Sequence, residues 1–202
     1  MDPKEKAQYL IDKGYIEGDS FFKLAEQIEA VQEIKDTPKV EYISSATSNI
    51  VYTYEMFLKG LEKITEQIRS DRWQPDYIVG IVRGGSVPAI YLSHRLKIPV
   101  VMLQWSTRDV NLPNECNAWI PEDVNMGKNV LIIEDIVDSG ITIKEVLADW
   151  NKSIHEELKL ANIRIAAMIN NVSQDVKVDY CDVNIDRNVD KRWVELPWEA
   201  KL

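Results

Sequence analysis

The chain has 202 residues, of which 45% are hydrophobic and 28% are charged, a composition that excludes disordered and collagen-like proteins. Its 33 acidic and 24 basic residues give a formal net charge of −9, which argues against a broad nucleic-acid-binding surface but permits a local phosphate site. Two cysteines are too few for a disulfide framework, and no apolar run reaches the roughly 18 residues of a membrane helix, so we expect a cytoplasmic protein without membrane or nucleic-acid partners.

The first part of the chain is predicted to be a helical extension. Amphipathic patterns indicate two short helices between residue 1 and about residue 36, and Thr37-Pro38 then interrupts the helical pattern. We assign residues 1–50 to this extension and residues 51–202 to the main domain. A further helix is expected to begin after Thr53, as its N-cap, and to end before Trp73.

Short apolar runs alternate with helical patterns along the main domain. Runs of this kind are typical of buried parallel strands, and the expected strands are 77–82, 98–103, 130–133 and 163–169, with one more within 176–185. The expected helices are 86–96, with Ser86 as its cap, and 142 to about 158. We expect residues 105–128 to form a long polar loop that closes over a site.

This alternation predicts an α/β fold with a mainly parallel sheet flanked by helices. In such folds, ligands bind at the carboxyl ends of the strands. The turns at 83–85 and 134–142 both follow predicted strands, and we therefore expect them to meet at one edge of the sheet.

The segment VLIIEDIVDSGIT, residues 130–142, carries the strongest chemical signal. Ser139 and Gly140 precede a predicted helix, where hydroxyl and backbone N–H groups can cradle an anion. The adjacent Glu134 and Asp135 suit sugar hydroxyls or a divalent cation. A phosphate, a sugar and a metal in sequence indicate a phosphorylated ribose.

Two structural alternatives accompany this interpretation. Thr142 and Glu145 have the spacing of a capping box, so that Thr142 could cap the helix or contact a ligand. Arg83-Gly84-Gly85 has the composition of a plain tight turn as well as that of a loop that approaches a phosphate closely.

The segment VLIIEDIVDSGIT resembles the phosphoribosyl-pyrophosphate (PRPP) signature of type I phosphoribosyltransferases at every position. IVGIVRGGSVPAIYLSHRLKI resembles the pyrophosphate loop of the xanthine-guanine and hypoxanthine members, and RWVELPWE resembles their closing segment. The resemblance implies the phosphoribosyltransferase fold with a C-terminal hood at about residues 186–202. It further implies Mg²⁺, a homodimer or homotetramer, and a role in purine salvage.

Residue by residue, the resemblance implies a complete donor site. Glu134 and Asp135 would hold the ribose hydroxyls and Mg²⁺. The 5′-phosphate would be wrapped by Asp138, Ser139, Gly140, Ile141 and Thr142. The pyrophosphate would be contacted by Arg83, Gly84 and Gly85, and by Arg108 from the loop. In the family, the peptide that links the residues matching Arg83 and Gly84 is often cis.

On the base side, the resemblance makes Asp138 the residue that handles the proton of the base. Trp193 would stack on the base, and the backbone of Val194 would read its edge. Asn171, or its neighbour Asn170, stands where purine members carry a lysine that donates to a six-oxo group, and an amide leaves six-oxo and six-amino bases both open. Hypoxanthine, guanine or xanthine is the first expectation.

Two alternatives to this function were weighed on the sequence. The first is the same transfer to another base, adenine or a pyrimidine. The second is a non-catalytic regulator that senses PRPP and binds nucleic acid, which the net charge of −9 and the presence of Asp138 disfavour.

Overall fold

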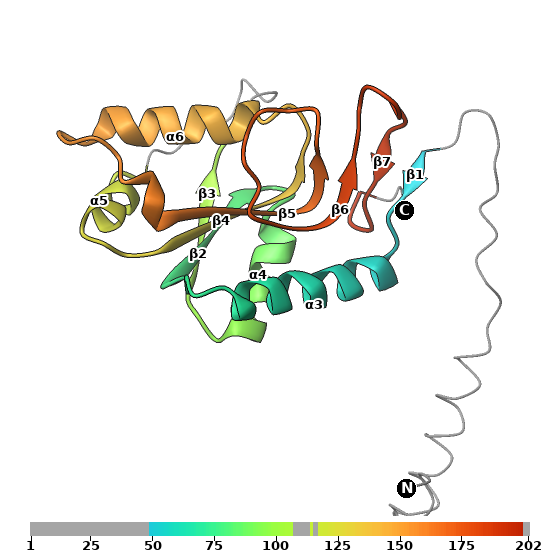
Figure 1. Ribbon diagram of the computed structural model, residues 1–202, viewed down its shortest axis with the longest axis horizontal. Coiled ribbons are helices and arrows are strands. Elements are labelled where there is room, and N and C mark those ends of the chain that lie inside the picture. Colours follow the sequence, from blue (N-terminus) through green and yellow to red (C-terminus); the bar gives the residue numbers. More distant parts are fainter. Residues whose placement is uncertain (1–48, 107–113, 115–116, 200–202) are drawn as a thin grey trace, which may run out of the picture. The chain divides into compact units, whose positions relative to one another are not determined.

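The computed structural model describes residues 49–106, 114 and 117–199, which are built around a parallel sheet (Figure 1). This sheet has five strands in the order β3-β2-β4-β5-β6, and every neighbouring pair is parallel. The strands are β2 (Tyr77–Val82), β3 (Val100–Gln104), β4 (Val130–Val137), β5 (Ile163–Asn171) and β6 (Tyr180–Ile185). The predicted α/β class is confirmed, and the predicted extension lies outside the described residues except for Asn49 and Ile50.

Alternating side chains of the strands pack against helices on both faces of the sheet. Val79 and Ile81 belong to one core, which they share with α5 (Trp119–Asn125) and α6 (Ile141–Ser153). Ile78 belongs to the other core, which is covered by helices α3 (Tyr54–Ser70) and α4 (Ser86–Leu96), as Figure 1 shows. Burial on both faces explains why these strands are continuously apolar in sequence.

Helix α3 begins as the sequence predicts. The Thr53 side chain accepts a hydrogen bond from the Met56 N–H at 3.2 Å, which satisfies one of the amides that lack a partner in the first turn. The helix then buries Phe57, Leu61 and Ile64 against the sheet.

Several predicted boundaries are wrong. The predicted loop at 105–128 contains α5, and Gly85 rather than Ser86 is the N-cap of α4. Strand β4 continues four residues beyond the predicted end, through Val137. Helix α6 ends at Ser153, because the next residue is extended, and a single 3₁₀ turn (Leu160–Asn162) then precedes β5.

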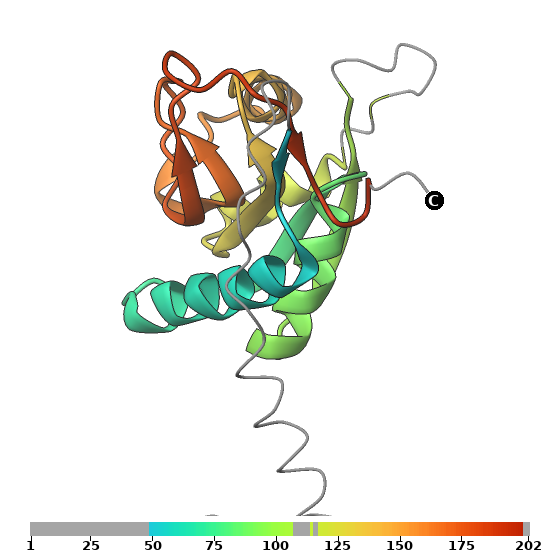
Figure 2. The ribbon, with the colours of Figure 1, turned by 90° about the vertical axis from the view of Figure 1, so that its right-hand side faces the viewer.

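Two short strands form a second, separate pair. Strand β1 (Ile50–Val51) lies parallel to β7 (Val194–Glu195), and Figure 2 shows the pair from the side. Ile50 thus pairs within the hood instead of ending the predicted extension. In the part of the chain that the structure describes, no helix is both long and apolar enough to span a membrane.

Candidate functional site

The two turns that follow β2 and β4 meet, as predicted. Their strands are parallel neighbours with Gly80 opposite Ile133, so both turns leave the sheet at its carboxyl edge. A Cβ on Gly84 would overlap the carboxylate of Asp135, and a Cβ on Gly85 would overlap the carbonyl oxygen of Ile133. Glycine is therefore required at both positions for the turns to approach each other this closely.

A cavity of about 880 Å³ opens at this edge of the sheet. Most of the predicted site residues line it, namely Arg83, Gly84, Glu134, Asp135, Asp138, Ser139, Gly140, Ile141, Thr142, Trp193 and Val194. Gly85 lies behind the cavity wall, against the backbone of Ile81 and Ile133. Arg108 lies outside the described residues.

The wall of the cavity at 138–142 is the beginning of α6. Gly140 is its N-cap in the left-handed conformation (φ 73°), which favours glycine, and no side chain caps the helix. The first amides of an uncapped helix have no intrahelical partner and attract anions. The capping-box alternative for Thr142 is wrong, because Thr142 lies inside the helix and Glu145 instead accepts a hydrogen bond from the Trp105 indole at 3.2 Å.

Glu134 and Asp135 form the acidic wall of the cavity. Burial raises the pKa of Glu134 well above its ordinary value, and the neighbouring charge of Asp135 raises it further. Burial also raises the pKa of Asp135, although the N–H of Ile136 donates to its Oδ1 at 2.7 Å and lowers it. Two carboxylates that are costly to ionise without a partner are a suitable site for a cation.

The acidic wall fits Mg²⁺ better than it fits a metal held by protein ligands alone. Across the described ranges, no cluster of three or more His, Cys, Asp or Glu side chains could hold a metal ion. Mg²⁺ characteristically uses one or two protein carboxylates and completes its coordination with substrate phosphates and water. Glu134 and Asp135 are the residues that would hold it in this cavity.

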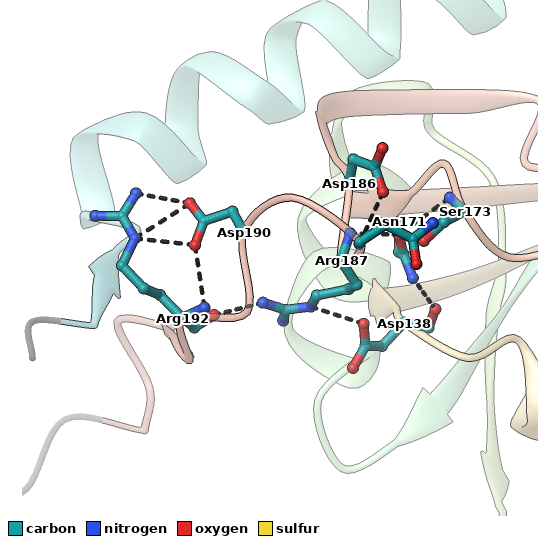
Figure 3. A network of polar contacts seen from close by, with 8 residues as sticks. Asp138, Asn171, Ser173, Asp186, Arg187, Asp190 and Arg192 are labelled. Atoms are coloured by element: carbon teal, nitrogen blue, oxygen red, sulfur yellow. Dashed lines mark hydrogen bonds and ion pairs between the residues drawn. The ribbon is translucent and has the colours of Figure 1, made fainter.

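At the opposite end of the cavity, Asp138 forms an ion pair with an arginine that the sequence reasoning did not single out. The Nε of Arg187 donates to Asp138 Oδ1 at 2.9 Å (Figure 3). Arg187 also donates from Nη1 to the carbonyl oxygen of Arg192. Trp193 lines the same cavity and is 53% exposed, so that much of its indole is accessible to a ligand.

Asn171 does not line the large cavity, where the sequence predicts it to contact the base. It is buried, and its Nδ2 donates to the carbonyl oxygen of Asp138 at 2.8 Å. Its Oδ1 accepts from the backbone N–H groups of Ser173 and Arg187, both at 3.1 Å. Asn171 therefore joins the turn after β4 to the hood instead of lining the large cavity. It borders a second cavity of about 370 Å³, which shares Asp138, Arg187 and Trp193 with the first.

The strand pair β1–β7 fixes the hood beside the cavity. The N–H of Ile50 donates to the Trp193 carbonyl at 2.7 Å, and the N–H of Tyr52 donates to the Glu195 carbonyl at 2.9 Å. Because bonded residues alternate along a strand, the N–H and C=O of Val194 point to the opposite side of β7. Trp198 packs edge-on against Phe57 and also lines the cavity.

The non-proline cis peptide lies one residue before the expected position. It joins Val82 to Arg83, at the junction of β2 and the turn, whereas the resemblance places it between Arg83 and Gly84. Arg83 and Gly84, which follow this peptide, still line the cavity.

The cavity residues that the sequence did not predict include Arg187, Trp105 and Glu199. Trp105 follows β3 directly, and this position at the carboxyl end of a strand was the signal that could have identified it. For Arg187 and Glu199 no such signal exists, because both lie in the irregular hood among other charged residues.

The fold and cavity define an α/β protein whose ligand site lies at the carboxyl edge of a parallel sheet. The phosphoribosyl transferase domain family matches residues 48–202, and the chain belongs to this family. This result confirms the resemblance to type I phosphoribosyltransferases.

Named relatives include enzymes for different bases. The chain is 26% identical over 137 residues to a xanthine-guanine phosphoribosyltransferase of Cereibacter sphaeroides. This alignment covers 62% of the chain and 70% of that protein. It is 35% identical over 85 residues to an orotate phosphoribosyltransferase of Brucella ovis, which spans 42% of this chain and 41% of that protein. The match thus covers less than half the length of the orotate relative.

Solved structures support the same family. A purine phosphoribosyltransferase from Pyrococcus horikoshii shares 25% identity and superposes with a TM-score of 0.56, covering 76% of this chain and 95% of that one. A xanthine-guanine-hypoxanthine phosphoribosyltransferase from Helicobacter pylori has 22% identity, the same TM-score of 0.56 and the same coverage of 76% and 95%, and this likeness concerns the fold.

Proposed function

We propose that the chain transfers the 5-phosphoribosyl group from PRPP to a purine base, giving a nucleoside monophosphate and pyrophosphate. Hypoxanthine, guanine or xanthine is the proposed base. We further propose that it acts in the cytoplasm, with Mg²⁺, as a homodimer or homotetramer, and without nucleic-acid or membrane partners. The observation that carries the proposal is that one cavity joins an uncapped helix start at 138–142, an acidic pair and an open tryptophan face.

Each region of the cavity has a role in this reaction. The amides and hydroxyls at 138–142 bind the 5′-phosphate, and Glu134 and Asp135 orient the ribose hydroxyls. Arg83 and Gly84 contact the departing pyrophosphate. Glu134 and Asp135 would hold Mg²⁺, which would supply positive charge to stabilise this leaving group.

On the base side, Trp193 stacks on the ring and Val194 contacts its edge through backbone groups. The carboxylate of Asp138 lines the same cavity as Trp193, and in this proposal it accepts the proton that the base nitrogen loses as the new bond forms to the anomeric carbon. The proton goes to Asp138, and the electron pair of the broken C–O bond leaves with pyrophosphate.

The test supplies purified full-length protein with PRPP, Mg²⁺ and a panel of bases, and measures nucleotide formation by chromatography. The panel contains hypoxanthine, guanine, xanthine, adenine and orotate, because the orotate relative makes a pyrimidine the main alternative. Nucleotide formed from a six-oxo purine supports the proposal. Turnover of orotate or adenine alone would overturn the six-oxo assignment, and PRPP binding without turnover of any base would favour the regulator.

A further inference from the structure

The base end of the site carries a cationic group with unused donors. Arg187 lines both cavities together with Asp138 and Trp193. We propose that Arg187 recognises a carbonyl oxygen of the base, the role that a lysine at position 171 would otherwise have. This inference rests on the proposed function and specifies which chemical group the base must present.

Most of the hydrogen-bonding capacity of Asn171 is used within the protein, and its side chain lacks the positive charge with which a lysine would read a carbonyl oxygen. Its Oδ1 accepts from the Ser173 hydroxyl at 2.6 Å in addition to the N–H groups of Ser173 and Arg187. One Nδ2 hydrogen is donated to the carbonyl of Asp138. These bonds fix the amide from both ends, and they hold the backbone of Arg187 beside the base end of the cavity.

The guanidinium of Arg187 has donors to spare. A guanidinium carries five N–H groups. Within the described residues, Nε donates to Asp138 and Nη1 donates to the carbonyl of Arg192, and no contact uses Nη2 (Figure 3). The side chain is only 19% exposed, so a ligand oxygen would satisfy donors that are largely shielded from solvent.

The charge around Arg187 favours an oxygen-rich base edge. The second cavity is bordered by Arg187, Lys191 and Arg192 but by a single carboxylate, that of Asp138. A six-oxo group presents an acceptor to these donors, whereas a six-amino group presents its own N–H donors and leaves the spare donors of Arg187 without an acceptor. Unpaired buried donors are penalised, and this penalty discriminates against the amino base.

The same ion pair has a second effect, which the experiment must separate from recognition. By binding Oδ1 of Asp138, Arg187 holds the carboxylate so that Oδ2 can accept the base proton. Loss of this positioning lowers kcat for every base alike. Loss of recognition instead changes the ratio between bases, and this ratio is therefore the decisive measurement.

The experiment compares wild type with Arg187→Gln and Arg187→Lys at saturating PRPP. We expect Arg187→Gln to reduce the kcat/KM ratio of hypoxanthine to adenine by about 10- to 100-fold, the contribution of one charged hydrogen bond. Arg187→Lys keeps a charged donor and is expected to recover a large part of the ratio. Arg69→Gln is the matched control, because this exposed arginine on α3 contacts the carbonyl of Arg95 and lines neither cavity.

A second readout keeps the inference testable without turnover. Calorimetric titration of inosine and adenosine monophosphates measures the same preference as a ratio of dissociation constants. An unchanged ratio in Arg187→Gln would overturn the inference even if kcat falls. Turnover of orotate alone, lost in Arg187→Gln, would overturn the purine function while supporting recognition of oxo groups by Arg187.

Discussion

The carboxylate of Asp138 has two oxygens with different surroundings, since Oδ1 accepts from Arg187 and Oδ2 is left for the base. Replacement by asparagine keeps the size of the side chain and removes its ability to take a proton. We expect Asp138→Asn to lower kcat by about 10²- to 10⁴-fold, the usual contribution of general acid–base catalysis, with PRPP affinity little changed.

Steady-state kinetics with PRPP and hypoxanthine measures this effect. Asp175→Asn is a suitable control, because Asp175 is 77% exposed in a surface ion pair with Lys144 and lines neither cavity. A wild-type kcat in Asp138→Asn would contradict the proton-transfer role, whatever its effect on base affinity.

Glu134 predicts a pH-dependent effect on stability. Because burial raises its pKa in the folded protein, the folded state keeps the proton above about pH 4.5 while the unfolded state loses it. Its contribution to the free energy of unfolding is therefore greatest below this pH and is lost as the pH rises through the folded pKa. Glutamine cannot ionise, so we expect Glu134→Gln to be more stable than wild type at mildly alkaline pH and nearly equal near pH 4.5.

Urea unfolding of the ligand-free protein across this pH range tests the sign of the effect. Glu134→Gln is also expected to bind PRPP more weakly. A residue with a purely structural role would not show this loss of PRPP affinity. A stability difference that does not grow with pH would show that Glu134 ionises freely in the folded protein.

The residues that the sequence could predict are those adjacent in the chain. Glu134 to Thr142 form one continuous strand–turn–helix segment, so their spacing alone indicated an anion site. The contact of Arg187 with Asp138 spans 49 positions, and nothing in the local pattern distinguishes Arg187 from Lys191 or Arg192. Asn171 was predicted at the right strand end, but its side chain is directed by partners that only the fold brings together.

At the scale of secondary structure, one short strand pair, β1–β7, supports the hood. A proline at position 50 removes the N–H that donates to the carbonyl of Trp193. We expect Ile50→Pro to raise the KM for the base several-fold, because Trp193 would lose its backbone support. PRPP affinity is expected to stay unchanged, because the turn at 138–142 would keep its backbone conformation. Initial rates with each substrate varied in turn would measure both constants.

Val51→Pro provides the matched control. In the parallel register, the N–H groups of Ile50 and Tyr52 donate to β7, whereas that of Val51 points away from it. Equal losses of base affinity in the two variants would show that proline acts by disrupting the strand in general. Equal losses of PRPP and base affinity in Ile50→Pro would show that β1 does not support the base site specifically.

Elements with long patterns were predictable and short ones were not. The strands β2, β4 and β5 are continuous apolar runs, which burial on both sheet faces requires. Helix α5 was missed because it has seven residues with Pro121 in its first turn, and β1 and β7 have only two residues each. The pairing of β1 with β7 arises from tertiary contacts between distant parts of the chain, which no local periodicity reveals.

For the whole molecule, the parallel strand order explains how distant segments form one site. Adjacent parallel strands end at the same edge, so the turns after β2 and β4 must converge. The resulting cavity brings the carboxylates of Glu134 and Asp135 together with the guanidinium of Arg187, on a chain with a net charge of −9. The net charge argued against a broad basic surface, but it carried no information about this local arrangement of acidic and basic side chains.

The parallel pairing of β1 with β7 also affects synthesis of the protein. Strand β7 starts at Val194, which is 143 residues after Val51 in the chain. It must emerge from the ribosome before the pair can form. A nascent chain that has emerged only through β6 already holds the turns for the sugar phosphate but lacks the support of Trp193. The proposed base site is therefore completed only after β7 has emerged.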